Sequence, residues 1–303
     1  MTMPSWGRIR RYYPLYLMLL PGILYYAIYR YFPLYGLTIA FKDYGMLDGI
    51  TGSAWADPWY KYFRDFYLSP YFYQLIGNTL LISVYKIVWS ALPQIALAVL
   101  LFECRSLWFR GTIQTLSYMP HFLSWVIING LAVAFLSSSN GLVNKTLEKI
   151  GLHSIPFLTS NDWFRGLLVA SDVWKDLGWG AIIYLAAMSA INPTLFEAAK
   201  VDGASRLRMI WHITLPGIRS VIVLLLILKL GHLLDAGFEQ VYIMYNISVY
   251  PTADIIDTWV FRTGLEQLNF SLASAVGLFK SVVGLVLVVG ANRLAKRWGE
   301  NVW

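Results

Sequence analysis

Long apolar runs separated by polar loops dominate the pattern of this chain. Each run has roughly 20 residues, which at a rise of about 1.5 Å per residue is enough to cross the hydrocarbon core of a bilayer as a helix. The six runs cover about residues 14–32, 78–102, 116–136, 164–191, 218–234 and 270–291. The pattern therefore predicts an all-α, polytopic membrane protein with six transmembrane helices.

The first run has the length and position of a secretory signal peptide, but no small-residue cleavage site follows it. Aromatic residues and Arg30 follow instead, so we expect this run to be retained as the first span. Residues 1–13 are then a short cytoplasmic segment, and residues 14–303 form one transmembrane domain.

The segment 192–217 is a polar interruption between the fourth and fifth runs. It opens with Asn192 and Pro193, which are typical of an N-cap followed by the first helical position. The short helix that follows is expected to reach Gly203, where a left-handed turn costs little. A second short helix, residues 204–212, is expected to stop at Leu215-Pro216. The chain would thus leave the membrane, form a compact helix–turn–helix, and re-enter.

Composition and charge place this segment on one side of the membrane. The chain is 57% hydrophobic and only 14% charged, whereas soluble domains have about a quarter of their residues charged. If the N-terminus is inside, twelve basic residues fall in four short inner segments and only seven in the longer outer loops. The positive-inside rule then places both termini and the 192–217 segment in the cytoplasm.

Several kinds of chemistry are missing from the sequence. Cys104 is the single cysteine and the four histidines are scattered, so we expect no internal disulfide, no catalytic constellation and no metal site. No G-x-x-x-x-G-K-[ST] phosphate-binding loop occurs. If ATP drives this protein, another chain must bind it.

The 192–217 segment also carries a resemblance to a known family. Glu197-Ala198-Ala199, Gly203 four positions later and Ile213-x-Leu215-Pro216 resemble the EAA loop of ABC-importer permease subunits, with seven fixed positions over twenty residues. In that family this loop is a cytoplasmic coupling helix that docks into a groove on the ATP-binding subunit. The resemblance implies that the ATPase-coupling residues are Glu197, Ala198, Ala199, Asp202, Gly203, Ala204, Arg206, Ile213, Leu215 and Pro216.

Within this loop we expect Glu197 to anchor the coupling helix by a charge or a hydrogen bond. Asp202 and Arg206 could pair with the ATPase surface.

Other motifs resemble the oligosaccharide and polysaccharide branch of these permeases, and within it the permeases of alginate-type, acidic-polysaccharide importers. They are Leu19-Leu20-Pro21-Gly22, Tyr118-Met119-Pro120-His121-Phe122, Trp174 with Gly178-Trp179-Gly180, Gly237-Phe238-Glu239-Gln240, residues 253–258 and residues 275–281. The resemblance implies the type I importer fold, with residues 14–303 as the permease domain in a bacterial cytoplasmic (inner) membrane. It also implies uptake of an oligo- or polysaccharide.

The partners implied are a second, different permease subunit, two ATP-binding subunits and an extracytoplasmic solute-binding protein. No cofactor is expected on this chain, because ATP and Mg²⁺ would bind the partner ATPase. No nucleic-acid partner is expected.

Ionisable residues inside the apolar runs are candidates for a substrate path, because a charge in the membrane usually faces a cavity or a partner. For Asp172, Lys175 and Asp176 the helical spacing favours a structural ion-pair cluster among the three. Lys86, Lys229 and Lys280 have no carboxylate three or four residues away. If they converge, the path would be cationic and would suit a uronate oligomer. Alternatively they snorkel to an interface or meet an acid on the partner permease.

Aromatic side chains are the other resource for binding sugars, although most of them are expected in interfacial belts. The candidate substrate-path residues are Lys86, Trp174, Lys175, Trp179, Tyr184, Lys229, Tyr242 and Lys280.

The sequence is less consistent with two other functional classes. A secondary transporter would show paired repeats with broken spans, and no such repeat is evident. A membrane-embedded enzyme would need a nucleophile–base or metal constellation, which the scattered histidines and single cysteine do not provide.

Overall fold

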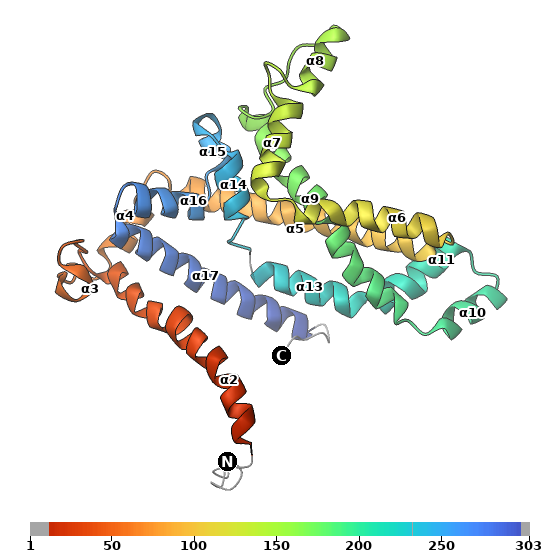
Figure 1. Ribbon diagram of the computed structural model, residues 1–303, viewed down its shortest axis with the longest axis horizontal. Helices are drawn as coiled ribbons and strands as arrows, with labels where there is room; N and C mark the ends of the chain where they lie inside the picture. The colour runs from red at the N-terminus through yellow and green to blue at the C-terminus, as the bar shows by residue number, and fades with distance from the viewer. Residues whose placement is uncertain (1–11, 232, 298–303) are drawn as a thin grey trace. The chain divides into compact units, whose positions relative to one another are not determined.

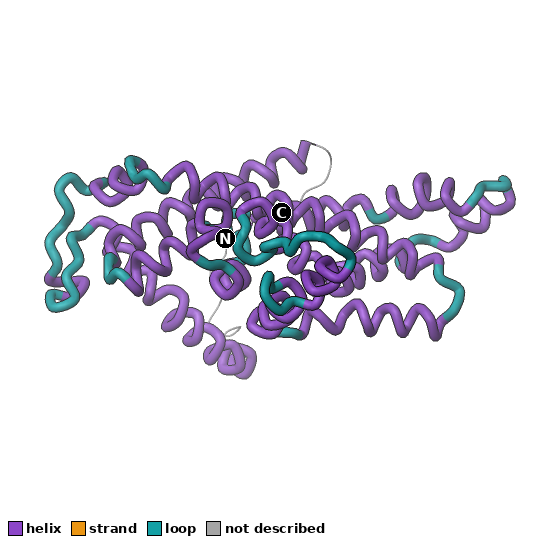
Figure 2. Tube along the Cα trace, turned by 90° about the horizontal axis from the view of Figure 1, so that it is seen from above, coloured by secondary structure: helices purple, strands orange, loops and turns teal. Residues whose placement is uncertain are grey.

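The computed structural model describes residues 12–231 and 233–297. These residues form helices and loops, and their only β-type pairing is an isolated bridge between Lys42 and Trp55 (Figure 2). The chain divides into two compact units, Met1–Ser69 with Val260–Phe279, and Pro70–Trp259 with Lys280–Trp303. The predicted cytoplasmic segment, residues 1–13, lies almost wholly outside the described residues.

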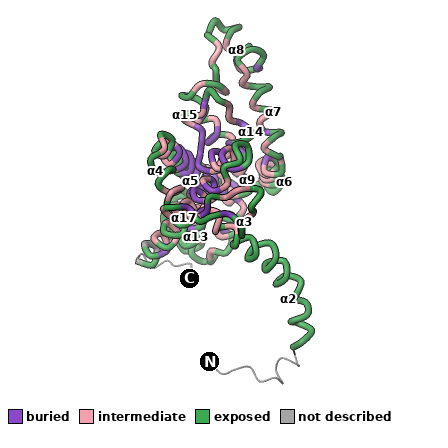
Figure 3. Tube along the Cα trace, turned by 90° about the vertical axis from the view of Figure 1, so that its left-hand side faces the viewer, coloured by how far each residue is buried: buried purple, intermediate pink, exposed green. Residues whose placement is uncertain are grey.

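The first unit begins with a helical run that changes type along its length (Figure 1). The α-helix α2 (Tyr13–Tyr26) passes into a π-helical turn (Ala27–Tyr31) and then into a 3₁₀-helix (Phe32–Phe41). Every residue of α2 is exposed although the helix is almost entirely apolar (Figure 3). Such a surface suits lipid or another protein rather than water. The predicted first span, 14–32, lies within this run.

A polar loop with two short helices, α3 (Gly49–Gly52) and α4 (Lys61–Tyr67), completes the first unit together with the start of α17 (Phe270–Arg297). Asp43 Oδ1 accepts hydrogen bonds from Lys61 Nζ and Tyr62 Oη, both at 2.7 Å. These bonds, that from Lys61 first, hold the pKa of Asp43 below its ordinary value. Ser271 Oγ donates to Lys42 O (2.6 Å), which joins the loop to α17.

The second unit is built around the packed pair α5 (Phe72–Glu103) and α9 (Asn161–Ser189). Figure 3 shows buried residues, in purple, where these two helices lie. One apolar cluster includes Ile82, Phe164 and Leu168, and a second includes Tyr184 and Met188. These clusters fix the relative position of the two helices and so of the polar residues between them.

Shorter helices make up most of the rest of this unit. They are α6 (Leu107–Tyr118), α7 (Trp125–Leu136), α8 (Leu142–Lys149), α10 (Pro193–Val201), α11 (Arg206–Met209), α12 (Leu215–Gly217), α13 (Arg219–Gly231), α14 (Phe238–Met244), α15 (Tyr250–Ala253) and α16 (Ile256–Phe261). The 3₁₀ segments Met119–Phe122 and Ile247–Val249 and the π-helical turn Ile210–Thr214 connect some of them. A further π-helical turn, Arg262–Glu266, belongs to the first unit.

The predicted span 116–136 is wrong as a single helix. The chain bends by 103° between Leu107–Phe122 and Trp125–Leu136. Pro120 lies in the 3₁₀ turn, and the Ser124 side chain caps the new helix α7 by accepting from Ile127 N. Lys175 Nζ, from α9, donates to the carbonyls of His121 (2.7 Å) and Leu123 (2.5 Å). The carbonyls at this break are therefore satisfied by a side chain of another helix.

Two described helices, Phe72–Glu103 and Phe270–Arg293, are long and apolar enough to cross a membrane unaided. Counting each bent pair as one span raises the number to five in the described part of the chain. The other two pairs bend by 71° between α9 and α10, and by 56° between Arg206–Gly217 and α13. The count of six spans and the cytoplasmic location of both termini stay predictions.

Candidate functional site

The 192–217 loop starts and turns as its sequence predicts. Asn192 caps α10 by accepting a hydrogen bond from Thr194 N (3.1 Å), and Pro193 takes the first helical position. Gly203 follows the helix with a φ of +75°. Gly203 N donates to Lys200 O and Ala204 N to Ala199 O, at 3.1 and 2.8 Å. This pair of bonds is the Schellman motif, which needs a residue with positive φ after the helix.

The second half of the loop differs from its prediction. The helix starts at Arg206, where Ser205 is the N-cap, and it does not end at Leu215-Pro216. It continues through the wide π-helical turn Ile210–Thr214 as far as Gly217. Pro216 therefore lies within this helical run rather than at its end, at the second position of α12.

The outer surface of the loop is unusually apolar for a polar segment. Val201 is 88% exposed, Leu207 70% and Trp211 67%. Exposed apolar side chains gathered on a short loop are typical of a contact surface. Glu197 is also exposed, and its carboxylate makes no hydrogen bond or ion pair with any described residue. The predicted anchoring by Glu197 is therefore not made within the described chain.

The loop is fastened to α5 by two contacts that the sequence did not predict. Arg206 Nη1 lies 3.5 Å from Glu103 Oε2. The ring of Phe196 lies 5.9 Å from that of Phe102. Glu103 and Phe102 end a helix about a hundred residues earlier in the sequence, so no local spacing could have indicated these contacts.

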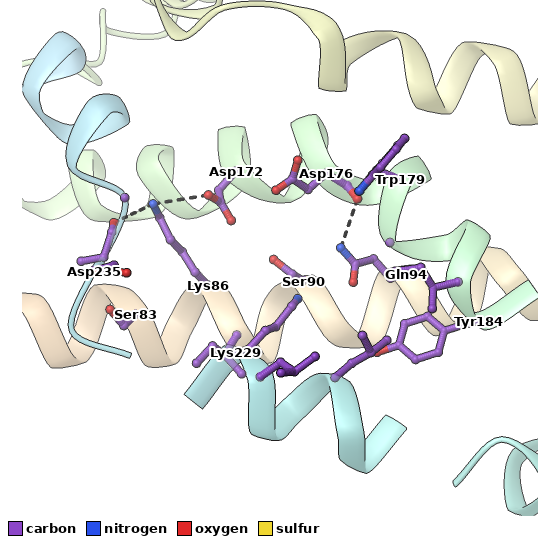
Figure 4. A pocket seen from close by; sticks show the side chains of 17 residues that line it. Ser83, Lys86, Ser90, Gln94, Asp172, Asp176, Trp179, Tyr184, Lys229 and Asp235 are labelled. Atoms are coloured by element: carbon purple, nitrogen blue, oxygen red, sulfur yellow. Dashed lines mark hydrogen bonds and ion pairs between the residues drawn. The ribbon is translucent and has the colours of Figure 1, made fainter. Parts of the chain in front are cut away.

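A polar pocket of about 460 Å³ lies between α5, α9, α13 and the segment 235–237 (Figure 4). It brings together four of the predicted substrate-path residues: Lys86, Trp179, Tyr184 and Lys229. The other polar residues that line it are Ser83, Ser90, Gln94, Asp172, Asp176 and Asp235. Its ionisable residues are thus two lysines and three aspartates, so their formal charges do not make the pocket cationic.

Lys86 lines this pocket, is buried, and forms an ion pair and hydrogen bonds with other segments. Its Nζ lies 3.4 Å from Asp172 Oδ1, and it donates to Ala236 O (2.8 Å) and to Gln240 Oε1. Gln240 in turn donates to Leu168 O at 2.7 Å and to Ser171 Oγ at 2.8 Å. Lys86 therefore connects α5 to α9 and to the start of α14. A buried charge with this many partners has a structural role.

The predicted ion-pair cluster of Asp172, Lys175 and Asp176 is wrong. Asp172 pairs with Lys86, and Asp176 Oδ1 lies 2.8 Å from His121 Nδ1. Lys175 binds the two carbonyls at the break before α7. Asp172 and Asp176 share the face of α9 that lines the pocket, and Lys175 points toward α7. Each charge therefore meets another segment before it meets a neighbour on its own helix.

Lys229 and Lys280 have different environments. Lys280 Nζ binds Asp257 Oδ1 (2.7 Å) and Asp235 Oδ1 (2.6 Å), which are distant in sequence, and it does not line the pocket. Lys229 lines the pocket half-buried and has no ion pair within the described residues. It is therefore the pocket's available cation in the described chain.

The structure separates the remaining candidates from the polar pocket. Trp174 lines a second cavity on another side of the α5–α9 pair. Tyr242 stacks on Phe238, with ring centroids 5.4 Å apart. The residue that sequence reasoning missed is His121, which lies parallel to Trp179 at 4.6 Å while it binds Asp176. Its place in the Tyr118–Phe122 motif gives no indication of either contact.

Comparisons with known proteins agree with this architecture. Residues 95–300 match the family described as "Binding-protein-dependent transport system inner membrane component". The polygalacturonan/rhamnogalacturonan transport system permease protein YteP of Bacillus subtilis is 47% identical over 95% of this chain and 89% of that protein. Protein LplB of the same organism is 43% identical over 98% and 93% of the two chains.

Solved structures extend the likeness to the whole fold. A chain of a bacterial alginate ABC transporter, crystallised with an alginate pentasaccharide-bound periplasmic protein, is 41% identical and superimposes with a TM-score of 0.90. The match covers 98% of this chain and 99% of that one. A second structure, of an ABC transporter involved in the import of the acidic polysaccharide alginate, matches with a TM-score of 0.89. The chain therefore belongs to the binding-protein-dependent transport system inner membrane component family and has the fold of an ABC-importer permease subunit.

Proposed function

We propose that this chain is one permease subunit of an ATP-driven importer for oligosaccharides that carry uronate carboxylates. The relatives named for a cargo support this, because polygalacturonan, rhamnogalacturonan and alginate all contain acidic sugars. The import complex would hold a second, different permease, two ATP-binding subunits and an extracytoplasmic solute-binding protein. It would lie in the bacterial cytoplasmic membrane.

The exposed surface of the 192–217 loop is the main support for this proposed function. It offers two short helices with outward-facing Val201, Leu207 and Trp211, and an exposed Glu197 without a partner among the described residues. We infer that an ATP-binding subunit covers this surface. The residues in contact or shaping the contact would be Glu197, Ala198, Ala199, Asp202, Gly203, Ala204, Arg206, Ile213, Leu215 and Pro216. ATP and Mg²⁺ would bind that subunit, and this chain would bind no cofactor.

Purification of the tagged chain from its native membrane and reconstitution of the complex in proteoliposomes test this function. We expect an ATP-binding protein and a second permease to co-purify with the tagged chain. Uptake of a galacturonate trisaccharide should then require ATP and the solute-binding protein. Uptake that proceeds without ATP and follows an ion gradient would instead establish a secondary transporter.

A matched variant locates the contact. Leu207→Asp should release the ATP-binding subunit, because it puts a charge into an apolar interface, while Leu142→Asp on α8 should not. Both leucines are exposed, at 70% and 56%. Equal subunit content in both variants would contradict the assignment of the loop.

A further inference from the structure

A second cavity, which we call the aromatic groove, lies on α5 and α9 away from the polar pocket. Its volume is about 930 Å³, within the usual range for ligand sites. Tyr85 and Trp89 line it from α5, and Asp162, Arg165 and Trp174 from α9. The polar pocket shares none of these residues.

Three aromatic side chains line the groove, two from α5 and one from α9. Tyr85 and Trp89 are four residues apart and so share a face of α5. Tyr85 is 42% exposed, Trp89 57% and Trp174 44%. An aromatic side chain offers a flat apolar face with a polar edge. The C–H face of a sugar ring stacks on such a surface, while its hydroxyls remain free to hydrogen-bond.

Arg165 places a fixed cation at one end of the groove. Its Nε and Nη2 donate to Thr252 O at 3.3 and 3.1 Å, and Nη2 also donates to Asn78 Oδ1 at 2.9 Å. Asn78 is itself held, because its Nδ2 donates to Asp254 O at 3.0 Å. Nη1 of Arg165 bonds to no described residue. A guanidinium anchored on two nitrogens, with the third available, is suited to binding a carboxylate.

The rest of the groove matches a saccharide better than a lipid. Arg165 and Trp174 are nine residues apart on α9, which is about 14 Å along the helix and leaves room for more than one sugar ring. Asp162 also lines the groove. Its carboxylate would accept hydrogen bonds from sugar hydroxyls, which a lipid acyl chain lacks. A uronate sugar offers both the carboxylate and the hydroxyls that these side chains require.

We propose that the aromatic groove binds the acidic oligosaccharide during uptake. Arg165 Nη1 donates to a uronate carboxylate, and Tyr85, Trp89 and Trp174 stack on sugar rings. Arg165 thereby determines selectivity for charged over neutral sugars. This inference depends on the proposed function, since it takes an acidic oligosaccharide as the cargo.

The test compares two cargoes in the reconstituted complex: a galacturonate trisaccharide, and the same trisaccharide with its carboxyl groups reduced to alcohols. Arg165→Gln should lower uptake of the acidic cargo by about tenfold or more, as expected for loss of a charged hydrogen bond, and leave neutral uptake unchanged. The matched control is Arg64→Gln, which should change uptake of neither cargo, because Arg64 is an exposed residue of the first unit that pairs with Asp65. Trp174→Ala should lower uptake of both cargoes.

Each other result contradicts the inference in a different way. An Arg165→Gln variant that loses both cargoes equally would show that Arg165 only holds the fold through Asn78 and Thr252. A lipid that co-purifies with the wild type and is lost in Arg165→Gln, with cargo selectivity unchanged, would make the groove a lipid site. A Trp174→Cys variant that crosslinks to the second permease and still transports would make it a subunit interface. Failure of the wild-type complex to take up either saccharide would instead contradict the proposed function itself.

Discussion

Gly203 has a φ of +75°, and an added Cβ would meet no atom within 4 Å. A side chain at this position would therefore cause backbone strain without a steric clash. For a residue other than glycine or asparagine that strain is about 1–2 kcal/mol. We expect this cost to change the shape of the exposed loop, while the helices on either side stay folded.

Gly203→Val should consequently leave the amount of protein in the membrane unchanged and lower ATP-driven uptake, because the Schellman turn no longer sets the angle between α10 and α11. Gly203→Asn is the control, since asparagine adopts positive φ readily. Uptake and ATP hydrolysis should be measured together in proteoliposomes. A valine variant with normal uptake would count against the loop as the coupling element.

The ion pair of Lys86 and Asp172 leads to a second prediction at this scale. Removal of one partner leaves a buried charge uncompensated, which costs about 3–5 kcal/mol. Lys86→Met and Asp172→Asn should each lower the thermal unfolding temperature of the purified chain in nanodiscs. The double variant should lose less than the sum of the two.

The exposed pair Arg64–Asp65 provides the control cycle and should show little coupling. Strictly additive losses for Lys86 and Asp172 would mean that the two side chains do not interact.

At the scale of single residues, the sequence predicted what depends on near neighbours. The Asn192 cap and the Gly203 turn follow from steric rules that act within a few residues, and both are confirmed. The partner of Asp172 could not be predicted, because the packing of α5 against α9 determines it. Helical spacing gave only the face of α9 on which Asp172 lies.

At the scale of elements, α6 and α9 approach each other closely at Gly178. A Cβ on this residue would lie 2.3 Å from the carbonyl oxygen of Ser117. Since the obstacle is backbone rather than a flexible side chain, the helices must separate to admit a methyl group. On the same helix, Gly166 has no atom within 4 Å of its added Cβ.

Gly178→Ala should therefore lower the unfolding temperature of the chain in nanodiscs. Gly166→Ala should raise it slightly, because alanine is favoured over glycine in a helix by about 0.5–1 kcal/mol. Thermal unfolding followed by circular dichroism measures both. If the two alanines have the same effect, the close approach of α6 and α9 is not a constraint on stability.

Hydrophobic runs located the apolar helices but not the bend inside one of them. The predicted span 116–136 crosses the 103° break before α7. A hydropathy window averages over this break, whereas the structure depends on Lys175 reaching two carbonyls from α9. Pro120 is a local signal of irregularity, but it carries no information about direction.

At the scale of the whole molecule, the side of the membrane on which each loop lies remains a prediction from charge. Cys104 is the single cysteine, so Cys104→Ser gives a background without thiols. In that background Val201→Cys should react with an impermeant maleimide only from the cytoplasmic side, and Leu152→Cys only from the outer side. Both positions are exposed.

Labelling of both positions from the same side would contradict the positive-inside assignment. It would also remove the 192–217 loop from the reach of ATP.

The family and the fold class were accessible from sequence because they depend on apolar length and on seven fixed positions in one loop. The two cavities could not be predicted from sequence, because they depend on how helices pack: the polar pocket lies between α5, α9 and α13, and the aromatic groove lies on α5 and α9. Trp174 and Trp179 are five residues apart yet line different cavities. Their shared motif gave no indication of this separation.

The 192–217 loop contacts the end of α5, a helix that does not adjoin it in sequence. The contacts are the ion pair between Arg206 and Glu103 and the ring contact of Phe196 with Phe102. A displacement of this loop would therefore act on α9 and α13, to which it is joined, and on the end of α5, which it contacts. The helix α5 is about 48 Å long. Farther along it, Lys86 forms an ion pair with Asp172 of α9. We expect a displacement of the loop to be transmitted along α5 past the polar pocket, so that the helices lining the pocket move together.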